Sequence, residues 1–157
     1  MKVLYLLGIA WGLFGDIAIQ NTVAGDSPVH WSITSAKISE MEYVLFFDAM
    51  IDTDWHLYCR SQAVSSDDLV PPQITFYPNP DVEFAGFVNE IGEPEPVLSE
   101  LIGVTINVFK TKVSYNTIAI TKSTKEPISV KGEIDYITCT KSMCVKPPKK
   151  VFEITLN

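Results

Sequence analysis

Short clusters of apolar residues recur along the chain, and many of them alternate with polar positions. In the segment 42–51, the side chains at every second position from Tyr43 to Ile51 are apolar, and most of those between them are apolar as well. Alternation with a period of two is typical of a β-strand, and apolar residues on both faces favour a central strand. Segments of this kind, rich in β-branched and aromatic residues, predict strands at 29–38, 42–51, 73–77, 82–88, 104–110, 113–121, 128–139 and 151–156.

Turn-forming residues separate these segments, as at Pro71-Pro72 and Pro78-Asn79-Pro80. No stretch after residue 25 keeps a helical apolar stripe over three turns. Seven or eight short strands in roughly 130 residues are typical of an antiparallel sandwich or barrel. We therefore expect one all-β domain, and we interpret the acidic, proline-containing stretch from Glu90 to Glu100 as a solvated loop.

The first residues form an apolar segment with a different pattern. Lys2 is followed by the uncharged run Val3 to Gly15. One positive charge before about a dozen apolar residues is typical of a secretory signal peptide, and the run is shorter than the roughly twenty residues that span a bilayer. A buried N-terminal helix or strand is the alternative. Because Thr22 and Ala24 fit the small-x-small rule for cleavage, we expect a signal peptide over 1–24 and an exported domain over 25–157, with a cut after Gln20 as the alternative.

Composition and charge limit the classes of function. The chain has 157 residues, of which 46% are hydrophobic, so it fits one folded domain and not a disordered chain. A net charge of -7 gives no electrostatic support for binding nucleic acid. The charge is uneven, because residues 26–100 hold fourteen acidic residues against two basic ones, whereas residues 101–157 hold nine lysines against four acidic residues. The basic part contains two of the three cysteines.

Cys139 and Cys144 lie between the last two expected strands, at the head of a hairpin. Alternation along 128–139 places Cys139 on the face that carries the charges, near the surface. Four intervening residues allow the two Cα atoms to approach to roughly 5–6 Å, the usual distance across a disulfide. The pair is then either a structural disulfide or a redox-active one. A zinc site is less favoured, because no second pair of Cys or His has matching spacing.

The surroundings of the pair bear on this choice. Closing so short a loop stabilises a fold by only about 2 kcal/mol, so a purely structural disulfide would add little stability here. Lys141, Lys146, Lys149 and Lys150 surround the cysteines and favour thiolate, which speeds disulfide exchange. Spacing alone leaves the structural and redox interpretations open.

Two further residues could carry chemistry but have simpler interpretations. Cys59 lies outside any pair, and we expect a free, partly buried thiol. His56, beside Trp55, is expected to pack or to form hydrogen bonds. A metal site built from His56 and the cysteines is the remaining alternative, and we expect no cofactor.

Several short motifs occur in the order in which one known family has them. They are Val29-His30-Trp31, Asp54-Trp55-His56-Leu57-Tyr58, Pro72-Gln73-Ile74-Thr75-Phe76, Gly86, Glu93-Pro94, Tyr136-Ile137-Thr138-Cys139 and Cys144-Val145-Lys146-Pro147-Pro148. On these residues the chain resembles the N-terminal periplasmic domain of the thiol:disulfide interchange protein DsbD, also found as separate exported disulfide bond corrector domains. The resemblance covers about residues 28–157, and the cysteine-containing ending is its most specific part.

The resemblance implies an immunoglobulin-like antiparallel β-sandwich in the periplasm. It implies that Cys139 and Cys144 relay reducing equivalents, with Cys144 as the attacking thiol. The donor and the acceptors would be thioredoxin-fold proteins, and a separate membrane protein would supply the electrons. The rival interpretation is a non-catalytic exported binding or assembly module with a structural disulfide.

The family also has a cap loop that covers the disulfide with an aromatic side chain. The corresponding residues here are Glu100, Leu101, Ile102 and Gly103 after Ser99, and the large apolar ones among them are aliphatic instead of aromatic. Supporting roles beside the cysteines are expected for Tyr136, Lys141, Lys146 and Pro147.

Overall fold

The computed structural model describes residues 27–62, 69–125 and 127–157, and the expected signal peptide over 1–24 lies outside them. Among the described residues, no helix is long and apolar enough to span a membrane. The strands are β1 (Val29–Lys37), β2 (Glu42–Ile51), β3 (Leu57–Tyr58), β4 (Gln73–Phe76), β5 (Val82–Ile91), β6 (Glu95–Leu98), β7 (Thr105–Phe109), β8 (Lys112–Thr121), β9 (Ile128–Asp135), β10 (Thr138–Cys139), β11 (Cys144–Val145) and β12 (Lys150–Leu156).

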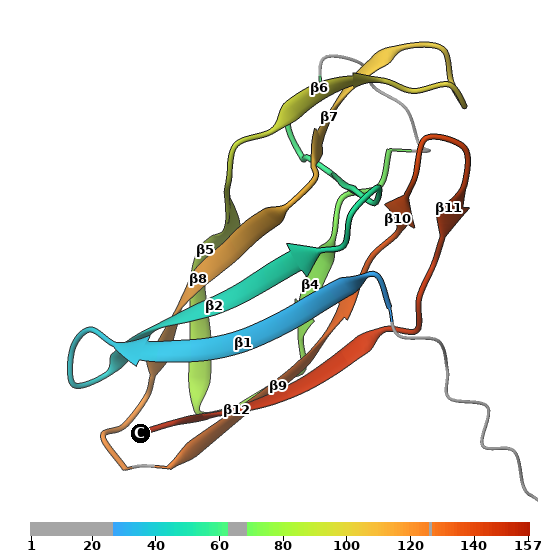
Figure 1. Ribbon diagram of the computed structural model, residues 1–157. Coiled ribbons are helices and arrows are strands. Elements are labelled where there is room, and N and C mark those ends of the chain that lie inside the picture. The colour runs from blue at the N-terminus through green and yellow to red at the C-terminus, as the bar shows by residue number, and fades with distance from the viewer. Residues whose placement is uncertain (1–26, 63–68, 126) are drawn as a thin grey trace, which may run out of the picture.

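Two antiparallel sheets form the sandwich that the sequence predicts (Figure 1). One has the strand order β1-β2-β8-β5, and the other has the order β12-β9-β4. The predicted central position of β2 is confirmed, since it pairs with β1 on one side and β8 on the other. The alternation of β2 also holds, because Tyr43, Leu45, Phe47 and Ala49 are all buried.

The core lies between the two sheets and contains many aromatic rings. Phe47 of β2 meets Phe152 of β12 edge-on, with ring centroids 5.1 Å apart. Gly132 of β9 lies so close to Phe152 that a Cβ there would come within 2.5 Å of the ring, so the second sheet needs a glycine at this position. At the other side of the core, Trp31 contacts Tyr136 with centroids 5.5 Å apart. Large rings therefore hold the sheets together along much of their length.

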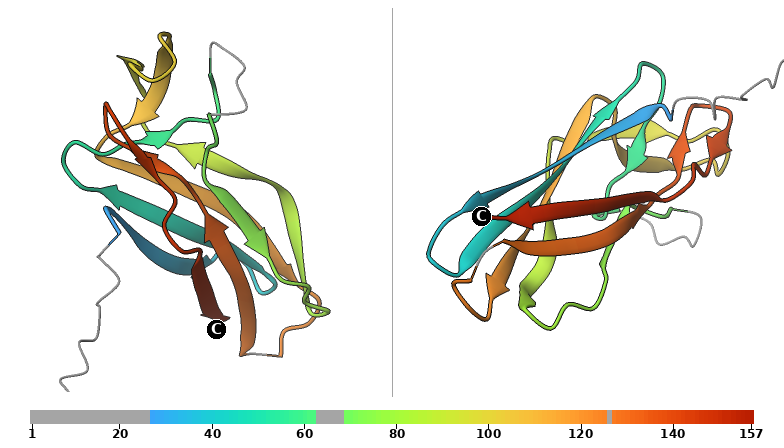
Figure 2. Two further views of the ribbon diagram at one scale, coloured as in Figure 1. Left: turned by 90° about the vertical axis from the view of Figure 1, so that its right-hand side faces the viewer. Right: turned by 90° about the horizontal axis from the view of Figure 1, so that it is seen from below.

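Both sheets are extended at the same end of the molecule. β2, β8 and β5 are continued by β3, β7 and β6, which form a smaller sheet in the corresponding order β3-β7-β6. β9 and β12 are likewise continued by β10 and β11, which pair as a hairpin. The two extensions lie at the end opposite the C-terminus in Figures 1 and 2. An isolated β-bridge between His56 and Cys139 joins them, so this end of the sandwich is where the two sheets meet.

The prediction of a loop from Glu90 to Glu100 is wrong. β5 continues to Ile91, and Glu95–Leu98 forms β6, which pairs with β7. Proline predicted a break here, but β6 is an edge strand and pairs on one side only. An edge strand tolerates the missing N–H of a proline, and Pro96 therefore fits within it.

The predicted strand over 128–139 is also interrupted. β9 ends at Asp135, and β10 begins at Thr138. Tyr136 belongs to the main core, whereas Ile137 packs against a second, smaller cluster that contains Cys139. Burial still alternates as far as Thr138, and the expected alternation is broken at Cys139, which is buried as well.

Candidate functional site: the disulfide hairpin

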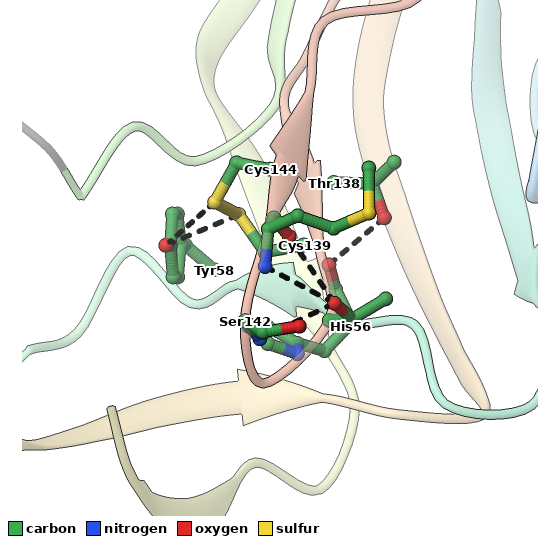
Figure 3. Close-up of a disulfide and its surroundings, with 8 residues drawn as sticks. His56, Tyr58, Thr138, Cys139, Ser142 and Cys144 are labelled. Atoms are coloured by element: carbon green, nitrogen blue, oxygen red, sulfur yellow. Dashed lines mark hydrogen bonds between the residues drawn. A yellow bond between two sulfur atoms is a disulfide. The ribbon is translucent and has the colours of Figure 1, made fainter. Parts of the chain in front are cut away.

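Cys139 and Cys144 form a disulfide at the tip of the β10–β11 hairpin (Figure 3). The two residues lie directly opposite each other in the ladder, with their Cα atoms 4.0 Å apart. The turn between them is closed by Thr140, whose N–H donates to the carbonyl of Met143 over 2.8 Å. The Thr140 hydroxyl accepts the N–H of Met143 over 3.2 Å. The sequence-predicted hairpin is therefore confirmed.

The two sulfur-bearing residues differ in exposure. Cys139 is only 1% exposed, whereas Cys144 is exposed. The prediction that Cys139 lies on an outward, charged face is wrong, because the extension of the first sheet covers β10. The disulfide therefore offers Cys144 to an incoming molecule and keeps Cys139 inside.

His56 provides the backbone that covers Cys139. Its N–H donates to the Cys139 carbonyl over 2.8 Å, and the Cys139 N–H donates to the His56 carbonyl over 3.1 Å. The buried hydroxyl of Thr138 donates to the same His56 carbonyl over 3.0 Å. These three hydrogen bonds attach the hairpin to the loop before β3.

Tyr58 lies against the disulfide itself. Its hydroxyl is 3.2 Å from Cys139 Sγ and 3.7 Å from Cys144 Sγ, and it donates because disulfide sulfurs carry no hydrogen (Figure 3). The Tyr58 side chain is buried, and its ring meets the ring of His56 edge-on. Tyr58 is not among the predicted site residues, although it lies in one of the motifs that carry the resemblance. Its placement comes from β3, a strand of two residues that no pattern predicts.

Apolar residues enclose the inner side of the disulfide. Tyr58 and Cys139 belong to one buried cluster with Leu69, Ile106 and Val108, and Val97, Ile102 and Ile137 pack against it. Burial of this kind keeps water from the sulfur atoms on this side.

The predicted cap residues form the turn between β6 and β7. The turn is closed by the Ser99 N–H, which donates to the Val104 carbonyl over 2.9 Å, and by the Gly103 N–H, which donates to the Ser99 carbonyl over 2.8 Å. Gly103 has a φ of 70°, a conformation that glycine adopts without a steric cost. Ile102 points to the cluster that contains Cys139, whereas Leu101 is 52% exposed and Glu100 is exposed. Of the predicted cap residues, Ile102 is thus the one that packs against the cluster around Cys139.

The lysines near the hairpin are only partly available to the cysteines. Lys146 lies 3.2 Å from Asp135, and Lys149 pairs with Glu133, whose pKa it lowers through a hydrogen bond. Lys141 is exposed, and it forms no ion pair with any residue that the structure describes. Carboxylates of β9 therefore offset part of the positive charge that the sequence places beside the disulfide.

Of the other predicted supporting residues, Tyr136 is turned away from the disulfide. It is buried in the main core, where its hydroxyl lies 2.7 Å from the Ser27 hydroxyl. Pro147 is half-buried in the segment between β11 and β12.

Cys59 is a free thiol, as expected, and it is buried more fully than the sequence predicts. Its Sγ donates to Glu90 Oε1 over 3.0 Å, and the same carboxylate accepts the Arg60 N–H. Burial, together with the hydrogen bond to Glu90, raises the pKa of Cys59 to about 11. The thiol is therefore protonated near neutral pH and reacts poorly.

No protein-family model and no curated protein sequence matches the chain. Among solved structures, it is similar to the N-terminal periplasmic domain of ScsB from Proteus mirabilis, with a TM-score of 0.58 and 15% identity over 86% of this chain. The chain shares the fold of that domain. It covers 48% of that domain's length, so it spans about half of this neighbour. The similarity confirms the expected all-β, immunoglobulin-like fold.

Two other structures have lower similarity scores. One is the yeast GGA1 GAE domain, with 8% identity over 86% of this chain and 96% of that chain, and a TM-score of 0.49. The other is the reduced N-terminal domain of DsbD from Neisseria meningitidis, with 11% identity over 79% of this chain and 82% of that chain, and a TM-score of 0.37.

Proposed function

We propose that the chain is a thiol–disulfide exchange protein that passes reducing equivalents between thioredoxin-fold partners through Cys139 and Cys144. One observation carries the proposal: an exposed sulfur-bearing residue, Cys144, is bonded to a buried one whose sulfur accepts a hydrogen bond from Tyr58. Such an arrangement has an accessible sulfur to attack and a stabilised sulfur to leave.

Reduction of the pair follows from this geometry. A partner thiolate attacks Cys144 Sγ, the bond to Cys139 breaks, and Cys139 leaves as a thiolate that Tyr58 stabilises by its hydroxyl. The second thiolate of the partner then attacks the partner sulfur that is bonded to Cys144, and Cys144 is released as a thiolate. The partner is now a disulfide, and the chain has gained two electrons and holds a dithiol.

Transfer to an acceptor is the reverse sequence. The Cys144 thiolate attacks the acceptor's disulfide and forms a mixed disulfide, which Cys139 resolves. The acceptor leaves as a dithiol, and the Cys139–Cys144 bond forms again. Ile102 of the cap limits access to the inner side of the bond while no partner is present.

The proposed location is the periplasm, after removal of a signal peptide over 1–24, so that the exported domain is 25–157. The periplasmic neighbour supports this location. The donor would be reduced in turn by a separate membrane electron transporter.

The rival function is a structural disulfide in an exported binding module. The burial of Cys139 and the tight turn at Thr140 favour it, since a shielded bond in a short hairpin resists attack.

The reduction potential of the pair, measured together with its rate of exchange, separates the two functions. For the proposed relay we expect a potential above about -300 mV and rapid exchange with a thioredoxin-like protein. A lower potential and an inert bond would establish the structural role. Replacing Cys139 with Ser leaves Cys144 free to trap partners as mixed disulfides in the exported fraction, where mass spectrometry can identify them.

A further inference from the structure

A groove of about 390 Å³ lies beside the disulfide hairpin. Three parts of the chain line it: the loop Asp54–His56, the turn Thr140–Ser142, and the small sheet through Val97 together with Lys110 after β7. The groove therefore borders both the cap hairpin, β6–β7, and the hairpin that carries the disulfide. A molecule bound in it would contact both hairpins.

The groove contains a buried side chain with unused hydrogen-bonding groups. His56 is 9% exposed, and its imidazole forms no hydrogen bond with any residue that the structure describes. Burial and the charge of Lys110 lower its pKa, so the ring is neutral near pH 7 and has one N–H donor. Neither ring nitrogen is among the fully buried polar atoms that lack a partner, so the imidazole is open to hydrogen bonds from the groove that it lines.

The charges that line the groove are two lysines and one aspartate. Lys141 comes from the disulfide hairpin and Lys110 from the far side, where it also pairs with Glu95 over 2.8 Å. Asp54 has a φ of 71° and turns the chain so that Trp55 and His56 follow along the groove. Lys141 forms no ion pair with any residue that the structure describes, and with Lys110 and Asp54 it gives the lining two positive charges against one negative charge. The site therefore suits a group that is negatively charged and accepts hydrogen bonds.

We propose that this groove binds a carboxylate side chain in an acidic segment of the thiol-exchange partner, held between Lys141 and Lys110 with the His56 N–H as an additional donor. This inference rests on the proposed function for the identity of the partner, because the groove adjoins the disulfide. Binding there places the partner's sulfur beside the exposed Cys144 and raises its local concentration. The groove would thus help to select partners.

The first test measures binding without any sulfur chemistry. The oxidised, exported domain is titrated with the blocked peptide Gly-Glu-Glu-Gly, and its backbone amides are followed by NMR. We expect shifts at His56, Lys141 and Ser142 that weaken with added salt, and no such shifts with Gly-Gln-Gln-Gly. Equal shifts with both peptides, or none at millimolar concentrations, would overturn the proposal.

Substitution of the lysines tests the two contacts. Lys141→Gln and Lys110→Gln are each expected to weaken binding of the acidic peptide roughly two- to fivefold, as expected for one partly exposed ion pair. The matched control is Lys125→Gln, which makes the same charge change in the β8–β9 turn, and it should leave the affinity unchanged. An equal loss of affinity in all three variants would show general electrostatic attraction and would refute binding in the groove.

The second test addresses the partner. Two Cys-Gly-Gly-Cys dithiol peptides are compared as reductants of the disulfide, one flanked by Glu-Glu and the other by Gln-Gln. The acidic peptide should react several times faster, and Lys141→Gln should reduce that advantage. If the acidic peptide binds but the acidic dithiol reacts no faster than the neutral one, then the groove does not serve the thiol-exchange partner. Failure of both dithiols to react would count against the proposed exchange function, whereas the binding test would still report on the groove.

Discussion

Cys59 and Cys139 are both buried in the same sandwich, being 3% and 1% exposed, yet their surroundings are opposite. Cys59 donates to the carboxylate of Glu90, which penalises loss of its proton. Cys139 lies beside the hydroxyl of Tyr58, which donates to its sulfur. Burial alone therefore does not decide how a sulfur behaves in this protein. The neighbouring group acts in addition to burial, which is the larger cause of the raised pKa of Cys59. An acceptor beside a sulfur favours the thiol, and a donor favours the thiolate.

The two sites also differ in access. Cys59 belongs to the main core between the sheets, whereas Cys139 is bonded to an exposed residue at a hairpin tip. Cys144 is exposed in the folded chain, without any opening of the sandwich. The fold thus separates a buried free thiol from a disulfide at an exposed hairpin.

The largest expected effect distinguishes the two sites directly. Cys144→Ser removes the disulfide and should abolish exchange with a thioredoxin-like protein in stopped-flow measurements. Cys59→Ala should leave the rate within about twofold, since the Cys59 side chain packs in the main core and not in the cluster around Cys139. Full exchange activity in Cys144→Ser, or its loss in Cys59→Ala, would contradict the comparison.

The second prediction concerns stability at high pH. The pKa of Cys59 is about 11 in the folded chain against an ordinary value of 9.0. Because the folded pKa is raised, the protonated thiol contributes its full stabilisation below pH 9, and this is lost as the pH rises through 11. The loss should reach roughly 2–3 kcal/mol in urea unfolding of the wild type. Cys59→Ala should lack this component of the pH dependence. If the variant and the wild type lose the same stability between pH 9 and 11, then the loss does not come from Cys59.

The third prediction tests the hydroxyl at the disulfide. Tyr58→Phe keeps the ring but removes the donor, so the leaving Cys139 thiolate is less stable and reduction should slow about tenfold, as for one hydrogen bond to a charged group. The matched control is Tyr77→Phe, which removes an exposed hydroxyl that bonds Glu133. Similar rates in both variants would show that the Tyr58 hydroxyl has no role in exchange.

The fourth prediction compares two neighbours in the cap. Ile102→Ala removes packing from the cluster around Cys139 and should speed reduction by dithiothreitol several-fold, because local opening becomes easier. Leu101→Ala removes an exposed side chain and should change the rate little. If Leu101→Ala has the larger effect, then Ile102 is not the shielding residue.

The smallest expected effect concerns the paired lysine. Lys146→Gln should alter the exchange rate by less than about twofold, since Asp135 already offsets this charge and exposed ion pairs contribute little. Stopped-flow rates at low and high salt provide the measurement. A large, salt-dependent loss would show that Lys146 acts on the cysteines despite its ion pair.

Much of the fold could be predicted because its signals are local. Each long strand has an alternating pattern, so β2 and its central place followed from its two apolar faces. The hairpin with Cys139 and Cys144 followed from spacing. The short strands β3, β6 and β11 did not, because two to four residues are too few to show a period. Prolines also predicted a loop where β6 lies, because the sequence does not show that β6 is an edge strand.

The amino-acid sequence by itself determined that this chain forms antiparallel strands and that two cysteines meet at a turn, since both follow from residues near one another in the chain. Only the tertiary structure decided which sulfur is buried, which hydroxyl it meets and which thiol stays protonated. Tyr58 and Cys139 are 81 positions apart, and Cys59 and Glu90 are 31 positions apart. Such contacts arise where the extensions of two sheets come together, and no local pattern of residues encodes them.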